Sequence, residues 1–162
     1  MTKDPYGRPL LPIEGVASAD ELARHLHDLF QSGLSMHGWE YFTTHRDFVN
    51  SQGKNYAHYE TALELILEFV RRDKFPQRPS RLQSYFAWDN LEAAIAFNTE
   101  RKPIFRVEAD AAFHADQVWL RLSNQGVAAA FSAHQYWSGA PSKNPRWEFV
   151  MVPPVRILER VA

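Results

Sequence analysis

One carboxylate near the C-terminal end of the chain combines a reactive group with an apolar setting. Glu148 stands at the start of the apolar run Phe149–Val152, which has the composition of a buried β-strand. A carboxylate at such a position loses hydration unless it points into a cleft or pairs with a base. We therefore expect Glu148 to serve a site, where it could stabilise positive charge that develops during a reaction. The alternative is an edge-strand glutamate in contact with water.

A strand that runs directly into a helix supplies a second group of candidate residues. Leu82–Trp88 is rich in aromatic and apolar residues and predicts a buried strand. Asp89 is expected to end this strand and to cap the following helix, with Glu92 completing a capping box. The short helix ends in an aromatic residue, Phe97. Polar and aromatic side chains stand at the entrance to this unit: Arg78, Arg81, Ser84 and Tyr85.

Positive charge is concentrated just before that unit. The segment Arg71–Arg81 is rich in arginine and follows directly on Tyr56–Phe75, whose apolar residues recur with the period of a long helix. Guanidinium groups are well suited to bind phosphate, so the segment could hold a phosphate-bearing ligand. It could also be the solvated basic end of the helix, which is the more common meaning of such a run.

The sequence offers little support for metal or nucleotide-fingerprint chemistry. His114 and Asp116 could begin a metal site, but no third ligand accompanies them, and a loop hydrogen bond is the favoured interpretation. The absence of cysteine excludes disulfides, thiolate zinc sites and cysteine nucleophiles. The sequence has no glycine-rich phosphate-binding fingerprint and no serine-hydrolase, zinc-protease or kinase signature. We expect no metal centre.

Two segments together resemble the ADP-ribosyltransferases, in the branch of poly-ADP-ribose polymerase and diphtheria toxin. Tyr85-Phe-Ala, followed by a short helix that ends in an aromatic residue, is similar to the YFA…Y segment of that branch. Glu148, followed by four apolar residues, Pro153-Pro154 and a further strand, resembles the signature in which the catalytic glutamate precedes a buried strand and its return partner. The resemblance extends loosely over residues 38–160 and is to small bacterial or phage proteins of unassigned role.

This resemblance implies NAD-dependent mono-ADP-ribosyl transfer to a macromolecular acceptor, or NAD hydrolysis. Glu148 would be the catalytic residue, and Tyr85 and Phe97 would hold the nicotinamide ring of NAD between them. Ser84 would bind the nicotinamide amide, and Arg81 the phosphates. NAD is thus the expected substrate and partner, whereas the acceptor, a protein or a nucleic acid, is not identifiable from the residues. The alternative is a catalytically inactive binding or interaction module with the same fold.

The first strand of the family carries a basic residue that holds the ribose or phosphate of NAD. Gly38–Thr44 is predicted to be the equivalent strand, because it is rich in aromatic and β-branched residues. Tyr41 stands where the basic residue is expected, and Thr43 lies close to the end of the strand. His37 or His45 could supply the missing charge from a neighbouring position. We therefore include Tyr41, Thr43 and His45 among the candidate NAD-binding residues; a core strand without a ligand is the alternative.

The whole pattern predicts a single α+β domain with a split, mainly antiparallel sheet and flanking helices. Residues 1–17, rich in proline and glycine, indicate an irregular arm, followed by one ADP-ribosyltransferase-like domain over residues 18–162. The formal net charge of −1, the lack of a long apolar run and the absence of a signal-peptide pattern predict a cytoplasmic protein without membrane contact. Further elements are expected as a helix from Ser18 to Gly33, a strand at Lys102–Glu108, a helix at Gly126–Trp137 closed by Gly139, and strands at Pro145–Val152 and Val155–Val161.

Overall fold

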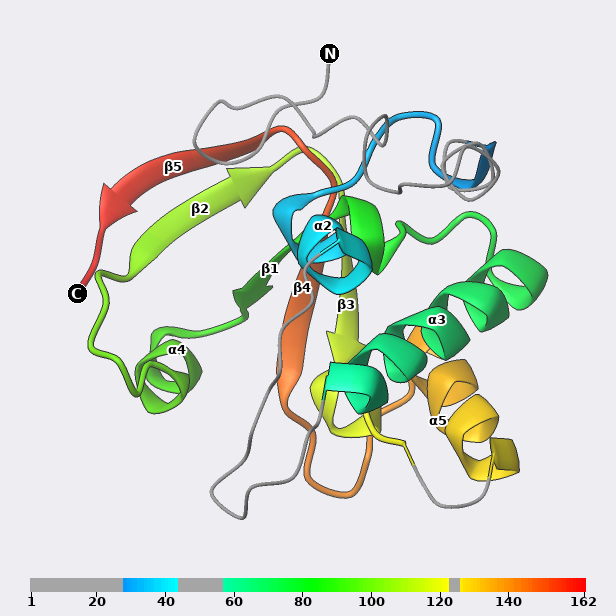
Figure 1. Ribbon diagram of the computed structural model, residues 1–162. Coiled ribbons are helices and arrows are strands. Elements are labelled where there is room, and N and C mark those ends of the chain that lie inside the picture. The colour runs from blue at the N-terminus through cyan, green and yellow to red at the C-terminus, as the bar shows by residue number, and fades with distance from the viewer. Residues whose placement is uncertain (1–27, 44–56, 123–125) are drawn as a thin grey trace.

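Two small antiparallel sheets and a set of helices make up the fold (Figure 1). The computed structural model describes residues 28–43, 57–122 and 126–162. The predicted arm, most of the predicted first helix and His45 lie outside these residues. One sheet has the strand order β1-β4-β3, with β1 at Tyr85–Trp88, β4 at Trp147–Met151 and β3 at Ala112–Asp116. The other pairs β2, Phe105–Ala109, with β5, Val155–Arg160. The prediction of an α+β domain with antiparallel sheets is confirmed at this level.

The three-stranded sheet has an inner face toward the helices and an outer face away from them. Trp88 lies opposite Glu148 on β1 and β4, and Ala115 lies opposite Glu148 on β3. Because side chains alternate along a strand, these residues share the inner face, while Tyr85, three positions before Trp88, points to the outer face. Phe149 lies on the outer face as well, so the successive residues Glu148 and Phe149 face opposite sides of the sheet.

Two helices, α3 (Ala57–Lys74) and α5 (Gly126–Ser138), cover the inner face (Figure 1). Leu67 is fully buried, and its carbonyl oxygen accepts a hydrogen bond of 2.8 Å from Nε1 of Trp137, which joins the two helices. Gly139, with a φ of 77°, ends α5 as predicted. The core between helices and sheet consists of Leu63, Leu67, Phe113, Ala115, Ala133, Tyr136, Trp137 and Val150.

The β2–β5 ribbon lies on the other side of the three-stranded sheet from α3 and α5 (Figure 1). The chain leaves β4 through the cis Pro153–Pro154 peptide and then pairs with β2. The prediction that β5 is the return partner of the Glu148 strand is therefore wrong, since the neighbours of β4 are β1 and β3. The register of this strand pair shifts between Arg106 and Val107, as it does at a β-bulge.

The predicted strand Gly38–Thr44 is wrong, because Gly38–Thr43 belong to a helix, α2 (Met36–Thr43), and Thr44 lies outside the described residues. Ser35 caps this helix: its Oγ accepts a hydrogen bond of 3.2 Å from the amide of Gly38, and its carbonyl accepts one of 2.8 Å from the amide of Trp39. Capping and packing thus outweigh the strand propensity of the aromatic residues. Tyr41 lies on a helix as a result.

The strand–helix unit around Tyr85 forms as predicted, with shifted boundaries. Arg81–Gln83 is a 3₁₀ turn, η1, so the strand begins three residues later than predicted. The following helix, α4, spans Leu91–Phe97, and its N-cap is Asn90, whose side chain accepts a 2.8 Å hydrogen bond from the amide of Ala93. The predicted cap Asp89 is therefore off by one residue.

The start of α2 rests directly on η1. The carbonyl oxygen of Leu82 accepts hydrogen bonds from the amide and the hydroxyl of Ser35, at 2.9 and 3.1 Å. A Cβ atom on Gly38 would lie 2.1 Å from that same oxygen. Only glycine therefore allows α2 to approach η1 this closely.

We expect Gly38→Ala to lower the free energy of unfolding by about 1–3 kcal/mol, because the added methyl forces α2 away from Leu82. Helix propensity alone predicts the opposite sign, a gain of up to about 1 kcal/mol. Urea unfolding of the variant measures the difference. Met36→Ala, on the same helix with a side chain 38% exposed, is the control. A Gly38→Ala protein as stable as the parent would contradict this close contact.

Candidate functional site

A cavity of about 490 Å³ lies between α2, α3 and the inner face of β1 and β4. We call it the carboxylate cavity. It has an aromatic wall from β1 and α4 and a charged wall from α2, α3, η1 and β4. The aromatic residues are Phe86, Trp88 and Phe97, and the polar residues are His37, Tyr41, Glu60, Glu64, Arg81, Gln117 and Glu148.

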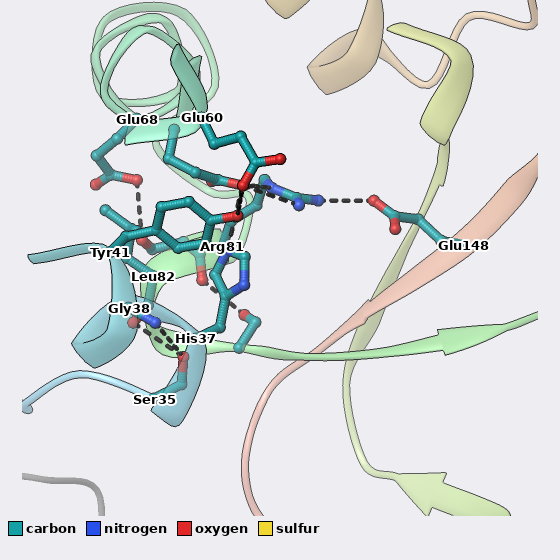
Figure 2. Close-up of polar contacts among 12 residues, drawn as sticks. Ser35, His37, Gly38, Tyr41, Glu60, Glu68, Arg81, Leu82 and Glu148 are labelled. Carbon is teal, nitrogen blue, oxygen red and sulfur yellow. Dashed lines mark hydrogen bonds and ion pairs between the residues drawn. The ribbon is translucent and has the colours of Figure 1, made fainter. Parts of the chain in front are cut away.

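The guanidinium of Arg81 connects two carboxylates at the base of this cavity (Figure 2). Its Nε and Nη2 donate to Glu64 at 3.0–3.1 Å. Its Nη1 donates to Oε1 of Glu148 at 2.7 Å. All three side chains are 7% exposed. A buried charge cluster of this kind is stable only when its members satisfy one another, so Arg81 joins α3 to β4.

The hydroxyl of Tyr136 completes the cluster from α5. It accepts a 2.6 Å hydrogen bond from Nη1 of Arg81 and lies 2.6 Å from Oε1 of Glu148, to which it donates. The guanidinium also lies over the ring of Phe86, with its central carbon 4.4 Å from the centroid. Helix, turn and strand thus meet at one set of polar atoms.

Burial and pairing set the charge states of this cluster. Burial alone would raise the pKa of Glu64, but the Arg81 guanidinium and the adjacent His37 ring outweigh it and lower the pKa to about 2. Burial opposes the charge of Arg81, yet Glu64, Tyr136 and Glu148 raise its pKa well above the ordinary value. Burial, together with Glu148, raises the pKa of Tyr136 well above its usual range, against the effect of Arg81. Glu64 and Arg81 are thus charged, and the Tyr136 hydroxyl keeps its proton near neutral pH.

His37 and Tyr41 extend the cluster on the α2 side of the cavity (Figure 2). Nε2 of His37 lies 3.1 Å from Oε1 of Glu64, and its ring contacts Tyr41 and Phe86 at centroid distances of 4.6 and 4.8 Å. The Tyr41 hydroxyl donates to Glu60 at 3.2 Å. Burial, followed by the charges of Glu60 and Glu64, raises the pKa of Tyr41 above its ordinary value.

The cavity wall therefore carries an excess of negative charge. Among the described residues that line it, three carboxylates, from Glu60, Glu64 and Glu148, face the guanidinium of Arg81 and the ring of His37. Such an environment stabilises a cationic ligand or a positive charge that develops during a reaction. It opposes an anion such as a phosphate.

A wider, mostly apolar hollow of about 1330 Å³ lies on the outer side of the sheet, between β1, α4 and the β2–β5 ribbon. Tyr85, Phe149 and Met151 line it from the sheet. Phe86, Ala87, Trp88 and Phe97 line both spaces. The rings of Trp88 and Phe97 contact each other at 5.1 Å between centroids, so this aromatic pair borders the hollow and the carboxylate cavity alike.

Comparison with known proteins places this site in a family. Residues 14–162 match the sequence profile of a family described as "Protein of unknown function (DUF2441)". The chain belongs to the DUF2441 family. The matched residues include every element that lines the carboxylate cavity. A search of curated proteins found no match.

In this DUF2441 chain, four of the predicted site residues meet at the carboxylate cavity: Tyr41, Arg81, Phe97 and Glu148. Arg81, predicted to bind phosphate, is buried and its guanidinium is directed to the carboxylates of Glu64 and Glu148. Thr43 ends α2, and the position of its side chain, like all of His45, lies outside the described residues.

Two predicted residues lie elsewhere. Ser84 is buried, and its hydroxyl donates to the carbonyl of Ser80 at 2.7 Å, so the hydroxyl proton is not free to bind a ligand. Tyr85 lines the apolar hollow together with Phe97, on the face opposite Glu148. The aromatic partner of Phe97 that shares the cavity with Glu148 is Trp88.

The basic segment after α3 is used mainly for internal contacts. Arg71 and Arg72 both donate to Glu68, at 2.6–2.9 Å. Arg71 also donates to the carbonyl of Arg78, whose own guanidinium lies 4.2 Å from the ring centroid of Phe113. These contacts leave less positive charge for an external phosphate than the sequence predicted.

His114 and Asp116 make other contacts in the structure. The described residues contain no cluster of three or more His, Cys, Asp or Glu suited to a metal ion. Asp116 instead accepts hydrogen bonds from the backbone amides of Val118, Ser142 and Arg146, as the loop interpretation predicted. His114 stacks on Trp147 and Phe149. Among the described residues, no helix is long and apolar enough to cross a membrane.

Glu64, Trp88 and Tyr136 were not predicted to be parts of the site, whereas His37, expected as a possible source of the missing positive charge, does line the cavity. One signal for Glu64 was present: Glu60, Glu64 and Glu68 recur every four residues beside the apolar positions of α3. Carboxylates so close to a buried helix face need partners. No local pattern indicated the hydroxyl contact of Tyr136, because its partners are far away in the sequence.

Glu64 should make the stability of the protein depend on acid pH. Its folded-state pKa, about 2, is below the ordinary value of 4.5, so folding favours the charged form. The resulting stabilisation, on the order of 3 kcal/mol, is complete above the unfolded-state value and is lost as pH falls toward 2.

We expect Glu64→Gln to lower the free energy of unfolding by about 3–5 kcal/mol at pH 7, because the variant leaves Arg81 with one charged partner fewer. The difference from the parent should shrink as pH falls from 5 toward 2. Urea unfolding over this range measures it, with Glu92→Gln, at an exposed position of α4, as the control. A difference that stays constant with pH would contradict the assigned charge state.

Proposed function

We propose that this chain is an NAD-dependent ADP-ribosyltransferase whose reaction takes place in the carboxylate cavity. The observation that carries the proposal is the position of Glu148 on the same sheet face as Trp88, in a cavity that also contains Phe97. The reaction releases nicotinamide from NAD and transfers ADP-ribose to a macromolecular acceptor or to water. The volume of the carboxylate cavity, about 490 Å³, lies within the usual range for small-molecule sites.

The charge and the rings of the cavity favour the nicotinamide end of NAD. Nicotinamide in NAD is a pyridinium, a flat aromatic cation. The three carboxylates of the cavity attract a cation, and the faces of Trp88 and Phe97 can stack against it. The phosphates of NAD would remain outside, because Arg81, the one guanidinium among the described residues of the cavity, is already paired.

Glu148 has a defined part in this reaction. The bond between the ribose C1′ and the nicotinamide nitrogen breaks, and its electron pair leaves with nicotinamide, which becomes neutral. The positive charge moves to the ribose, where a carboxylate stabilises it and can accept a hydrogen bond from the 2′-hydroxyl. An acceptor nucleophile then attacks C1′ and gives up its proton. The attraction between the Glu148 carboxylate and the ribosyl cation strengthens toward the transition state, so it accelerates the reaction and does not only bind NAD.

A second candidate function is a module that binds its ligand without turnover. The observation in favour of it is the 2.7 Å ion pair between Arg81 and Glu148, which offsets part of the negative charge that the reaction needs. The helical position of Tyr41, with no basic residue there, points in the same direction. Ligand binding and nicotinamide release must therefore be measured separately.

We expect purified protein to release nicotinamide from NAD, and Glu148→Gln to reduce the rate about a hundredfold, because the amide cannot stabilise the ribosyl cation. The affinity for NAD, measured by calorimetry, should fall much less than the rate, because the carboxylates of Glu60 and Glu64 remain in the cavity. Glu159→Gln, on β5 and outside the carboxylate cavity, is the matched control, and thermal melts report on folding. Binding of NAD without release by the parent would favour the binding module. A parent protein that neither binds NAD nor releases nicotinamide would contradict both functions.

A test of the aromatic wall uses a non-reacting cation, 1-methylnicotinamide. Trp88→Ala should weaken its binding about tenfold, since a ring stacked on a cation contributes on the order of 1 kcal/mol or more. Tyr85→Ala should leave the affinity unchanged, because Tyr85 lies on the outer face, away from Glu148. If only Tyr85→Ala weakened the complex, 1-methylnicotinamide would bind in the apolar hollow and not in the carboxylate cavity.

A further inference from the structure

The two oxygens of the Glu148 carboxylate have different surroundings. Oε1 receives the hydrogen bond from Nη1 of Arg81 at 2.7 Å and the one from the Tyr136 hydroxyl at 2.6 Å. Both of these hydrogen bonds end on Oε1, and neither of them involves Oε2. Short hydrogen bonds to a carboxylate are among the strongest in proteins, so Oε1 is firmly held. Two donors from different elements fix both the position and the rotation of the group.

The proton of the Tyr136 hydroxyl has one possible direction in this arrangement. A guanidinium can only donate hydrogen bonds, so the contact with Arg81 occupies a lone pair of the tyrosine oxygen. The hydroxyl proton must then point to Glu148. Burial raises the pKa of this hydroxyl well above its usual range, which keeps the proton in place.

Tyr136 itself has little freedom to move. It is fully buried, and its ring makes edge contacts with Phe113 and Trp137, at centroid distances of 6.4 and 4.9 Å. A phenylalanine could fill the same space. A buried hydroxyl costs desolvation that only its hydrogen bonds offset. The hydroxyl, unlike the ring, is therefore explained by Arg81 and Glu148 alone.

We propose that Tyr136 is a positioning residue that, together with Arg81, holds Oε1 of Glu148 and so leaves Oε2 toward the carboxylate cavity. This inference rests on the proposed function for its effect on catalysis. Oε2 is then the oxygen that meets the ribose, on the side where Trp88 and Phe97 line the cavity. A carboxylate held in this way does not have to reorient during the reaction. Such preorganisation of charged groups is the main source of electrostatic catalysis.

The inference also explains how Glu148 can pair with Arg81 and still act on a ligand. The ion pair and the tyrosine hydrogen bond both use Oε1. Oε1 of Glu148 is thus occupied by these two donors, and Oε2 is left for the ligand. A carboxylate with Arg81 as its only partner could rotate and present either oxygen.

The test is Tyr136→Phe, which removes the hydroxyl and keeps the ring. We expect kcat for nicotinamide release to fall about tenfold while KM for NAD changes little, because the loss affects the orientation of Glu148 and not the binding of the ring. Crystal structures of the parent and the variant should show the Glu148 carboxylate rotated in the variant.

Ser80→Ala is the matched control. It removes another buried hydroxyl–carboxylate hydrogen bond, the 2.9 Å bond from Ser80 to Glu68, which lies outside the carboxylate cavity. It should lower the melting temperature without reducing kcat. An equal loss of kcat in both variants would assign Tyr136 to stability only.

The possible failures are distinguishable. A parent protein that releases no nicotinamide overturns the proposed function, while the orientation of Glu148 in the two crystal structures still decides whether Tyr136 holds the carboxylate. An unchanged Glu148 in the variant overturns the positioning role, even if the parent is active. If Tyr136→Phe does not fold, the parent crystal structure remains decisive: a Tyr136 hydroxyl out of reach of Glu148 would overturn the inference.

Discussion

The arrangement of the described elements depends on one buried guanidinium, that of Arg81. Arg81 lies in a short turn between α3 and β1, and it pairs with Glu64 on α3 and with Glu148 on the central strand β4. Removing these charges from water is unfavourable, and only the close geometry of the cluster compensates for it. The relative positions of α3, η1 and β4 are therefore restricted to those in which the cluster is complete. The same restriction creates the carboxylate cavity, whose charged wall is this cluster.

A structural cluster and a reactive site need not be different places. Buried ion pairs often add little stability compared with apolar packing, but they specify one arrangement of the elements around them. In this chain the arrangement leaves an acidic space lined by aromatic rings, beside a cluster with more carboxylate than guanidinium groups. The imbalance is the physical reason for a cationic ligand, since a neutral cluster would have no preference for one.

The sequence predicted those features that depend on local periodicity. The helical period of Tyr56–Phe75 and Gly126–Trp137, and the glycine at 139, correspond closely to α3 and α5. The unusual position of Glu148 ahead of an apolar strand also indicated a buried carboxylate with partners. In each case a few neighbouring residues contain all the information that is needed.

The features that failed depend on contacts between distant segments. Gly38–Thr44 has the composition of a strand, but Ser35 and the carbonyl of Leu82 stabilise the helix that includes Gly38–Thr43. Tyr85 and Glu148 were expected to share a site, yet the pairing of β1 with β4 puts them on opposite faces. Because side chains alternate with a period of two, a shift of one residue in that register would reverse the result, and no local pattern determines it.

The helix α4 has a consequence for how a ligand could enter. None of its residues is buried, and its contribution to the cavity is Phe97, whose side chain is 64% exposed and contacts Trp88. A segment with so little buried surface opens locally at a much lower free energy than the whole domain unfolds. The core of α3, α5 and the sheet would not be disturbed. Phe97 can thus move away from Trp88 together with α4 at a free-energy cost that is separate from the global stability of the protein, and amide hydrogen exchange of α4 would report it.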